Sequence, residues 1–172
     1  SFPALHEWVN RESKLGNATL DAEVVSGNDG LVPIKTWSDA VNDSVKDIVH
    51  GVQPFPLVRE MLVRAAAKAD CMVISQTPTD ALEREWTENQ LDRFVFAIAG
   101  QEMGTKTQHL DLAAKDKYAP EKILMIGDAS GDHNAAEANG ALFFPINPGD
   151  EEACWNRLHN EGLEKFLGGT FA

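Results

Sequence analysis

Short apolar runs alternate with helical patterns from about residue 53 to the end of the chain. Nearly all side chains in these runs are apolar, as expected of parallel strands buried on both faces. The alternation is typical of βαβ units, in which helices cover both faces of a parallel sheet. The pattern therefore predicts an α/β fold with a Rossmann-like parallel sheet. We expect strands at 71–75, 94–98, 123–127 and 141–144, and helices at 56–68, 78–89, 106–117, 133–139 and 151–167, the last broken near Gly162.

The first part of the chain, residues 1–52, has a different pattern. Apolar residues recur there at intervals of three and four, which indicates helices, and a Gly/Asn/Asp break falls at 27–30. The pattern predicts no strand in this part. Residues 51–56 are rich in glycine and proline and form a plausible hinge. We therefore divide the chain into 1–52 and 53–172.

Composition narrows the classes of partner. The chain carries 27 acidic and 15 basic residues, a net charge of −12, with no basic cluster, so nucleic acids and anionic membranes are not expected as partners. Its apolar stretches are far shorter than the roughly 18 residues that a membrane-spanning helix needs. With only Cys71 and Cys154, the chain fits a reducing cytoplasm better than a disulfide framework. An anionic substrate would need a metal ion or a local cation.

The segment after the third predicted strand is the most informative for chemistry. Gly127 ends the strand, and Asp128 and Asp132 follow at a separation of four residues. Parallel sheets bind ligands at the carboxyl ends of their strands, and two carboxylates there suit Mg²⁺. The alternative is that Asp132 caps the next helix and Asp128 is a turn residue.

Two other strand ends carry candidate residues. Ser75 ends the first predicted strand, where a serine is often only a turn residue. Thr105 and Gln108 form a capping box that places Lys106 at the first helical position. The helix dipole disfavours a cation there by about 0.3–1 kcal/mol. A surface lysine tolerates this cost, and a nearby anion would remove it.

In this order, Ser75, Lys106, Asp128 and Asp132 resemble motifs of the haloacid dehalogenase superfamily of hydrolases, most of which are Mg²⁺-dependent phosphatases. Residues 72–75 resemble the second motif, Lys106 the third, and 127–132 the fourth. The resemblance implies that Ser75, Gln76 and Lys106 bind phosphate, with Ser75 and Lys106 catalytic. It implies that Asp128 is the main Mg²⁺ ligand, with Asp132 supporting it. It also implies that residues 1–52 are part of a helical cap and that 53–172 form the core.

The chain departs from this family in one important respect. The family's nucleophile is the first aspartate of an Asp-x-Asp motif that ends the first strand, and the sequence contains no Asp-x-Asp. In the family that strand lies between those ending here at Ser75 and Gly127. We therefore expect the C-terminal portion of a longer hydrolase, inactive alone, whose nucleophile lies on a missing N-terminal segment. A catalytically inactive binding or regulatory subunit is the alternative.

The substrate that the resemblance implies is a small phosphorylated metabolite, which the cap would select. His6 and Arg11 are candidates for that role, together with Trp8 and Trp37, although the periodicity favours core packing for both tryptophans. The remaining histidines have no zinc-binding spacing and are expected to be solvated helix residues: His50, His109, His133 and His159.

Overall fold

The structure is a computed structural model that describes residues 2–13, 15–48 and 50–171. The chain divides into two compact units, Ser1–His50 and Gly51–Ala172. In the described residues, no helix is both long enough and apolar enough to cross a membrane. The two units are described separately below and are called the first and second unit.

The first unit is helical, as the sequence predicts. Its buried core consists of Trp8, Leu20 and Leu31, so core packing is confirmed for Trp8. The same prediction is wrong for Trp37, which is 65% exposed. The elements are α1 (Pro3–Arg11), α2 (Asn17–Val25), the 3₁₀ turn η1 (Asp29–Leu31) and α3 (Val32–Ile48).

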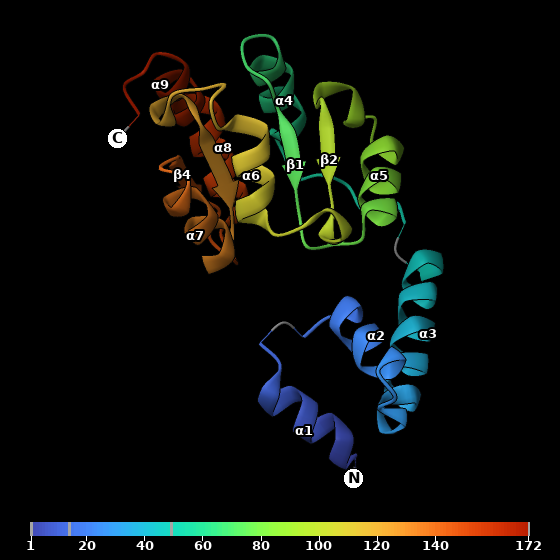
Figure 1. Cartoon of the computed structure of the whole chain (residues 1–172). Helices are drawn as coiled ribbons and strands as arrows, with labels where there is room; N and C mark the ends of the chain where they lie inside the picture. The colour runs from blue at the N-terminus through green and yellow to red at the C-terminus, as the bar shows by residue number, and fades with distance from the viewer. Residues whose placement is uncertain (1, 14, 49, 172) are drawn as a thin grey trace. The chain divides into compact units, whose positions relative to one another are not determined.

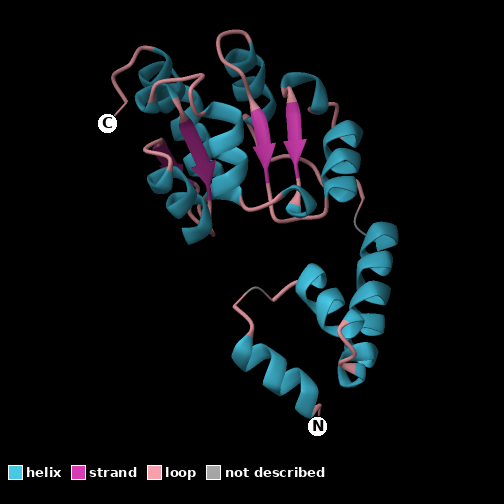
Figure 2. Cartoon of the chain, in the orientation of Figure 1, coloured by secondary structure: helices cyan, strands magenta, loops and turns pink. Residues whose placement is uncertain are grey.

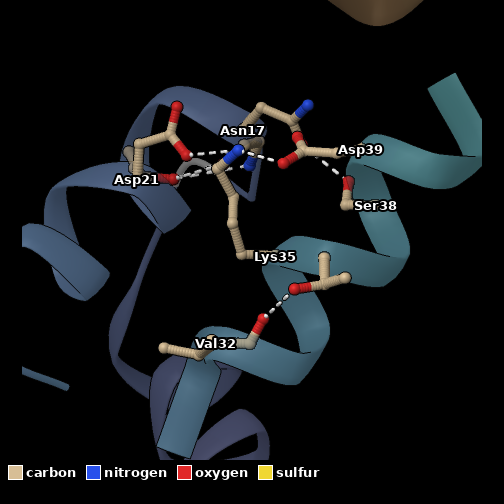
Figure 3. A network of polar contacts seen from close by, with 9 residues as sticks. Asn17, Asp21, Val32, Lys35, Ser38 and Asp39 are labelled. Atoms are coloured by element: carbon tan, nitrogen blue, oxygen red, sulfur yellow. Dashed lines mark hydrogen bonds and ion pairs between the residues drawn. The ribbon is translucent and has the colours of Figure 1, made fainter. Parts of the chain in front are cut away.

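A polar network joins α2 to α3 in the first unit (Figure 3). The Lys35 ammonium group lies 3.0 Å from an Asp21 carboxylate oxygen and 2.5 Å from one of Asp39. Ser38 donates a hydrogen bond of 2.7 Å to the side-chain oxygen of Asn17. Lys35 is the shared cation of two carboxylates here and links α2 to α3 beside their apolar contact through Leu20 and Ile34.

The second unit is a mixed α/β structure and contains the four predicted strands (Figure 1). Its strands are β1 (Met72–Ile74), β2 (Ala97–Ala99), β3 (Leu124–Gly127) and β4 (Leu142–Pro145). Its helices are α4 (Val58–Ala66), α5 (Thr79–Glu88), α6 (Lys106–Ala114), α7 (Ser130–Ala138), α8 (Glu151–Arg157) and α9 (Leu163–Leu167). The connections include the 3₁₀ turns η2 (Asp92–Phe94), η3 (Gln101–Met103) and η4 (Pro120–Lys122) and the π turn η5 (Leu158–Gly162).

Two of the differences from the sequence prediction concern β2 and the C-terminal helix. The second strand begins three residues later than expected, because Phe94, the first residue of the apolar run, belongs to η2. Phe96 lies between η2 and β2 and is 58% exposed. The expected break near Gly162 is a π turn instead, so the helix continues from α8 through η5 into α9. A Cβ atom at Gly162 would lie 3.2 Å from the ring of Phe144. The glycine therefore serves close packing of the helix on β4 and does not end the helix.

The strands form two separate parallel pairs, β1 with β2 and β3 with β4. Figure 2 shows the two pairs, with β1 and β3 as their inner members. In the described residues, β1 has no strand on the side opposite β2, and β3 has none on the side opposite β4. Helix α6 lies against both β1 and α7. The described residues thus form two halves of a Rossmann-like sheet with no strand between β1 and β3, and we call this position the slot.

The core of the second unit is formed by α4 and the C-terminal helices. Met61, Leu62 and Leu158 are buried there together with Phe144 and Ile146, at the end of β4. By contrast, all three residues of β1 are only half-buried, although each is apolar. The apolar surface of β1 is therefore less covered than that of a strand inside a complete sheet.

Candidate functional site

Ser75 lies directly after β1, at the carboxyl edge of the sheet. Its backbone N–H donates a hydrogen bond of 3.0 Å to the carbonyl oxygen of Ala99, which holds the residue to the end of β2. Its hydroxyl oxygen accepts a hydrogen bond of 3.1 Å from the N–H of Thr77. A hydroxyl group that accepts in this way still has its hydrogen to donate. Ser75 can therefore donate to an anion at this edge.

The side chain of Gln76 links two loops of the same edge. Its amide nitrogen donates to the carbonyl oxygen of Gly104 over 3.2 Å. Gly104 has a φ angle of +133°, in the region that favours glycine, and a Cβ atom there would lie 2.9 Å from the side-chain oxygen of Gln108. Gln76 thereby connects the residues after β1 to the start of α6.

The capping box that the sequence predicts at α6 is present. The Thr105 hydroxyl oxygen accepts a 3.3 Å hydrogen bond from the N–H of Gln108, and the Gln108 side chain accepts one of 2.9 Å from the N–H of Thr105. Lys106 is then the first residue of the helix, as predicted. The box fixes the direction in which this lysine leaves the backbone.

Lys106 forms an ion pair with Asp132 across α6 and α7, with 2.5 Å between the ammonium nitrogen and a carboxylate oxygen. The side chain of Asp132 is 3% exposed and that of Lys106 is 22% exposed. The carboxylate is the anion that offsets the unfavourable position of the lysine at a helix N-terminus. The third and fourth motif positions therefore meet directly.

Asp132 also accepts a 3.1 Å hydrogen bond from the N–H of Ala129 through its other oxygen. Helix α7 begins at Ser130, earlier than expected, so Asp132 is its third residue and not its N-cap. Gly127 permits this position, because a Cβ atom there would lie 2.3 Å from the carboxyl carbon of Asp132. The capping interpretation of Asp132 is thus correct in part, and the same carboxylate also holds Lys106.

Asp128 follows β3 immediately and is exposed. Its carboxylate and the buried carboxylate of Asp132 are oxygen donors on one strand-to-helix turn, a donor set that suits Mg²⁺ with water completing the coordination. In the part of the chain that the structure describes, no three His, Cys, Asp or Glu residues form a metal-binding group. Mg²⁺ is usually held by one or two carboxylates with water and substrate, and the carboxylates of Asp128 and Asp132 fit such an ion.

Glu102 is a residue of this edge that the sequence analysis missed. Its carboxylate accepts hydrogen bonds from the N–H and the hydroxyl of Thr79, at 3.0 and 2.8 Å, and so caps α5 from the loop after β2. Burial acts to raise the pKa of Glu102, but the Thr79 hydrogen bonds outweigh it and hold the pKa below its ordinary value. Glu102 and Thr79 are far apart in the sequence, so no local sequence pattern predicts this cap.

His109 corrects the expectation that every remaining histidine is solvated. It lies on α6, three residues after Lys106, and is only 4% exposed. It is buried on α6 together with Leu110 and Ala114. By contrast, His133 is an exposed helix residue, as expected, whereas His50 is exposed but outside the helices and His159 is half-buried.

A cavity among the described residues lies away from these residues. It has a volume of about 540 Å³ and is lined near the amino end of β3 by Leu110, Lys117, Tyr118 and Ile123, among others. None of the predicted site residues lines it. The candidate site is therefore defined by the residues at the carboxyl edge and not by this cavity.

Comparison with protein families gives one match. The family model described as "Haloacid dehalogenase-like hydrolase" matches residues 13–145, which is more than half of the chain. The comparisons with curated proteins and with solved structures found no match.

Proposed function

Because the chain belongs to the haloacid dehalogenase-like hydrolases, we propose that it is the C-terminal portion of a Mg²⁺-dependent phosphatase for a small phosphorylated metabolite. The observation that carries the proposal is the ion pair of Lys106 with buried Asp132, on the turn that also bears Asp128. This turn directly follows a parallel strand, where such sheets bind their ligands. We place the protein in the cytoplasm, where its free thiols, Cys71 and Cys154, would stay reduced.

Each residue of the edge has a role in this proposal. The Ser75 hydroxyl donates to a phosphoryl oxygen, and Lys106 neutralises negative charge on the phosphoryl group as it is transferred. Asp132 holds the lysine in position. The side-chain amide of Gln76 is already hydrogen-bonded to the carbonyl of Gly104, so Gln76 would bind phosphate through its backbone N–H.

Asp128 is the proposed main ligand of Mg²⁺, and Asp132 supports the ion or its waters. When bound, the ion would add to the positive charge of Lys106 in stabilising the phosphoryl oxygens. A calorimetric titration tests the assignment. Asp128→Asn should abolish Mg²⁺ binding, whereas Asp116→Asn, an exposed aspartate on the loop after α6, should bind as the unchanged chain does. Equal Mg²⁺ affinity in all three proteins would contradict the assignment.

The nucleophile is proposed to come from a strand that occupies the slot between β1 and β3. A strand parallel to both would end at the same edge as Ser75 and Asp128, so an Asp-x-Asp at its end would meet Lys106. Its first carboxylate would attack phosphorus as the ester P–O bond breaks, and water would then hydrolyse the aspartyl phosphate. We propose that this strand is an N-terminal segment of the same protein.

A synthetic peptide tests this proposal. It contains an apolar run of about five residues ending in Asp-x-Asp, the length of an ordinary strand. The chain alone should not hydrolyse an aryl phosphate, and the mixture with peptide should do so only with Mg²⁺. A peptide ending in Asn-x-Asn is the matched control. Turnover by the chain alone would refute the role of the strand.

The same experiment addresses the alternative of an inactive binding or regulatory subunit. If the peptide binds and turnover is still absent, the alternative is favoured. The coding sequence upstream of Ser1 provides an independent test. An apolar strand ending in Asp-x-Asp would support the enzyme, and its absence would support the binding subunit.

A further inference from the structure

His109 is a buried polar side chain with unused hydrogen-bonding groups. It is 4% exposed, and neither ring nitrogen has a hydrogen-bond partner among the described residues. A neutral imidazole has one donor and one acceptor nitrogen, and native proteins seldom leave such groups buried and unpaired. The ring therefore marks a contact that the described residues do not supply.

The ring lies at the candidate site. His109 is three residues after Lys106, on the same side of α6. Its Nε2 atom lies 3.6 Å from the position that a Cβ atom of Gly104 would take. Because Gln76 binds the carbonyl oxygen of Gly104, this loop is also tied to the end of β1. The unused nitrogens thus lie beside Gly104, which Gln76 ties to the carboxyl end of β1.

The chemistry of a central strand restricts what can reach this ring. The paired backbone N–H and C=O groups of a strand in the slot would be taken by β1 and β3, which leaves its side chains free to bond to His109. We infer that the imidazole N–H of His109 donates a hydrogen bond to a carboxylate of the acidic segment that ends this strand. This inference rests on the proposed function. It makes His109 a positioning residue that acts beside Lys106.

Peptide binding measured by fluorescence anisotropy tests the inference. The probes are the peptides ending in Asp-x-Asp and Asn-x-Asn, titrated into the full chain and into His109→Leu and His109→Gln. His6→Leu, at an exposed histidine of the first unit, is the matched control. Loss of one hydrogen bond should weaken binding of the acidic peptide by about tenfold in His109→Leu. The same variant should bind the amide peptide with little change.

The ring itself gives a second measurement that does not depend on a substitution. Adding the acidic peptide to the unchanged chain should shift the imidazole ¹⁵N resonances of His109, and the amide peptide should not. Binding of the acidic peptide with equal affinity by the chain and both folded His109 variants would overturn the inference and leave the proposed function intact. Unshifted ring resonances in the bound state would also overturn it. Absence of any peptide binding would overturn both proposals.

Discussion

Replacing Asp132 by asparagine tests whether the ion pair with Lys106 organises the edge of the sheet. Asparagine keeps the size of the side chain and an oxygen that can accept from Ala129, so the substitution mainly removes charge. Breaking a buried pair by removing one partner costs about 3–5 kcal/mol. Because the Lys106 side chain is 22% exposed and can turn toward water, we expect a smaller loss of about 2–3 kcal/mol.

Amide hydrogen exchange measured by NMR follows this loss locally. The buried residues Ala135 and Ala136 of α7 report on the helix that carries Asp132. A loss of about 2–3 kcal/mol should speed their exchange by about 30- to 150-fold. The control is Asp111→Asn, because Asp111 pairs with Lys115 at 3.1 Å but both side chains are mostly in solvent. That change should alter exchange by no more than about twofold.

A double-mutant cycle separates the pair from its surroundings. Lys106→Met leaves Asp132 buried without its cation and should also destabilise the second unit. The double variant should be more stable than the sum of the two losses predicts, by about 1–3 kcal/mol. Strict additivity of the two losses would refute the reasoning, because it would mean that the 2.5 Å contact contributes no coupling energy.

Three further predictions use the same measurements. Gly127→Ala should cost about 2 kcal/mol, because its Cβ would lie 2.3 Å from the carbon of a buried carboxyl group, whereas Gly131→Ala, on α7 with nothing within 4 Å, should stabilise by up to about 1 kcal/mol. Thr105→Ala should destabilise α6 by about 1 kcal/mol, and Thr105→Ser should restore it; equal exchange rates in all three proteins would argue against the cap. Hydrogen bonds from the Tyr118 hydroxyl and then from Lys117 lower the pKa of Asp70. Ionised Asp70 therefore stabilises the folded chain above the unfolded pKa of about 3.9, and this stabilisation is lost as the pH falls through the folded pKa. The urea midpoint of Asp70→Asn should therefore lie below that of the unchanged chain at about pH 5 and approach it at about pH 3, and a difference that does not vary with pH would contradict this.

Local signals in the sequence were sufficient for several features. The capping box at Thr105 placed Lys106 correctly, because helix caps depend on residues only three positions apart. The apolar runs located all four strands, because the pattern of a buried strand is also carried by residues that are neighbours in the sequence. They did not locate the start of β2, since an apolar run does not distinguish a strand from the preceding 3₁₀ turn.

Features that depend on distant residues were not predictable in this way. The burial of His109 depends on what packs against α6, and the cap that Glu102 forms on Thr79 spans two loops. The exposure of Trp37 shows the same limit, because helical periodicity indicates an apolar face but not whether that face is covered. The roles of the site residues, and the substrate, stay predictions.

The alternation of hydrogen bonds along β1 and β3 leads to a last prediction about the slot. The carbonyl of Cys71 and the N–H of Ser75 both bond to β2, so the N–H of Ile74, between Val73 and Ser75, points to the opposite side. On β3, the carbonyls of residues 123 and 127 accept hydrogen bonds from the β4 segment. The N–H of Ile126, by the same alternation, points away from β4.

These outward amides distinguish an open slot from a filled one. In the chain alone, the amide of Ile74 should exchange much faster than that of Val73, and Ile126 faster than Met125, because only Val73 and Met125 donate to a neighbouring strand. Adding the peptide that ends in Asp-x-Asp should protect Ile74 and Ile126 together, since one parallel strand would accept from both edges. Protection of only one of these two amides would mean that the peptide pairs with only one of the strands β1 and β3. Equal protection of all four amides before any peptide is added would mean that the slot is not open, and the proposed position of the nucleophile would then be wrong.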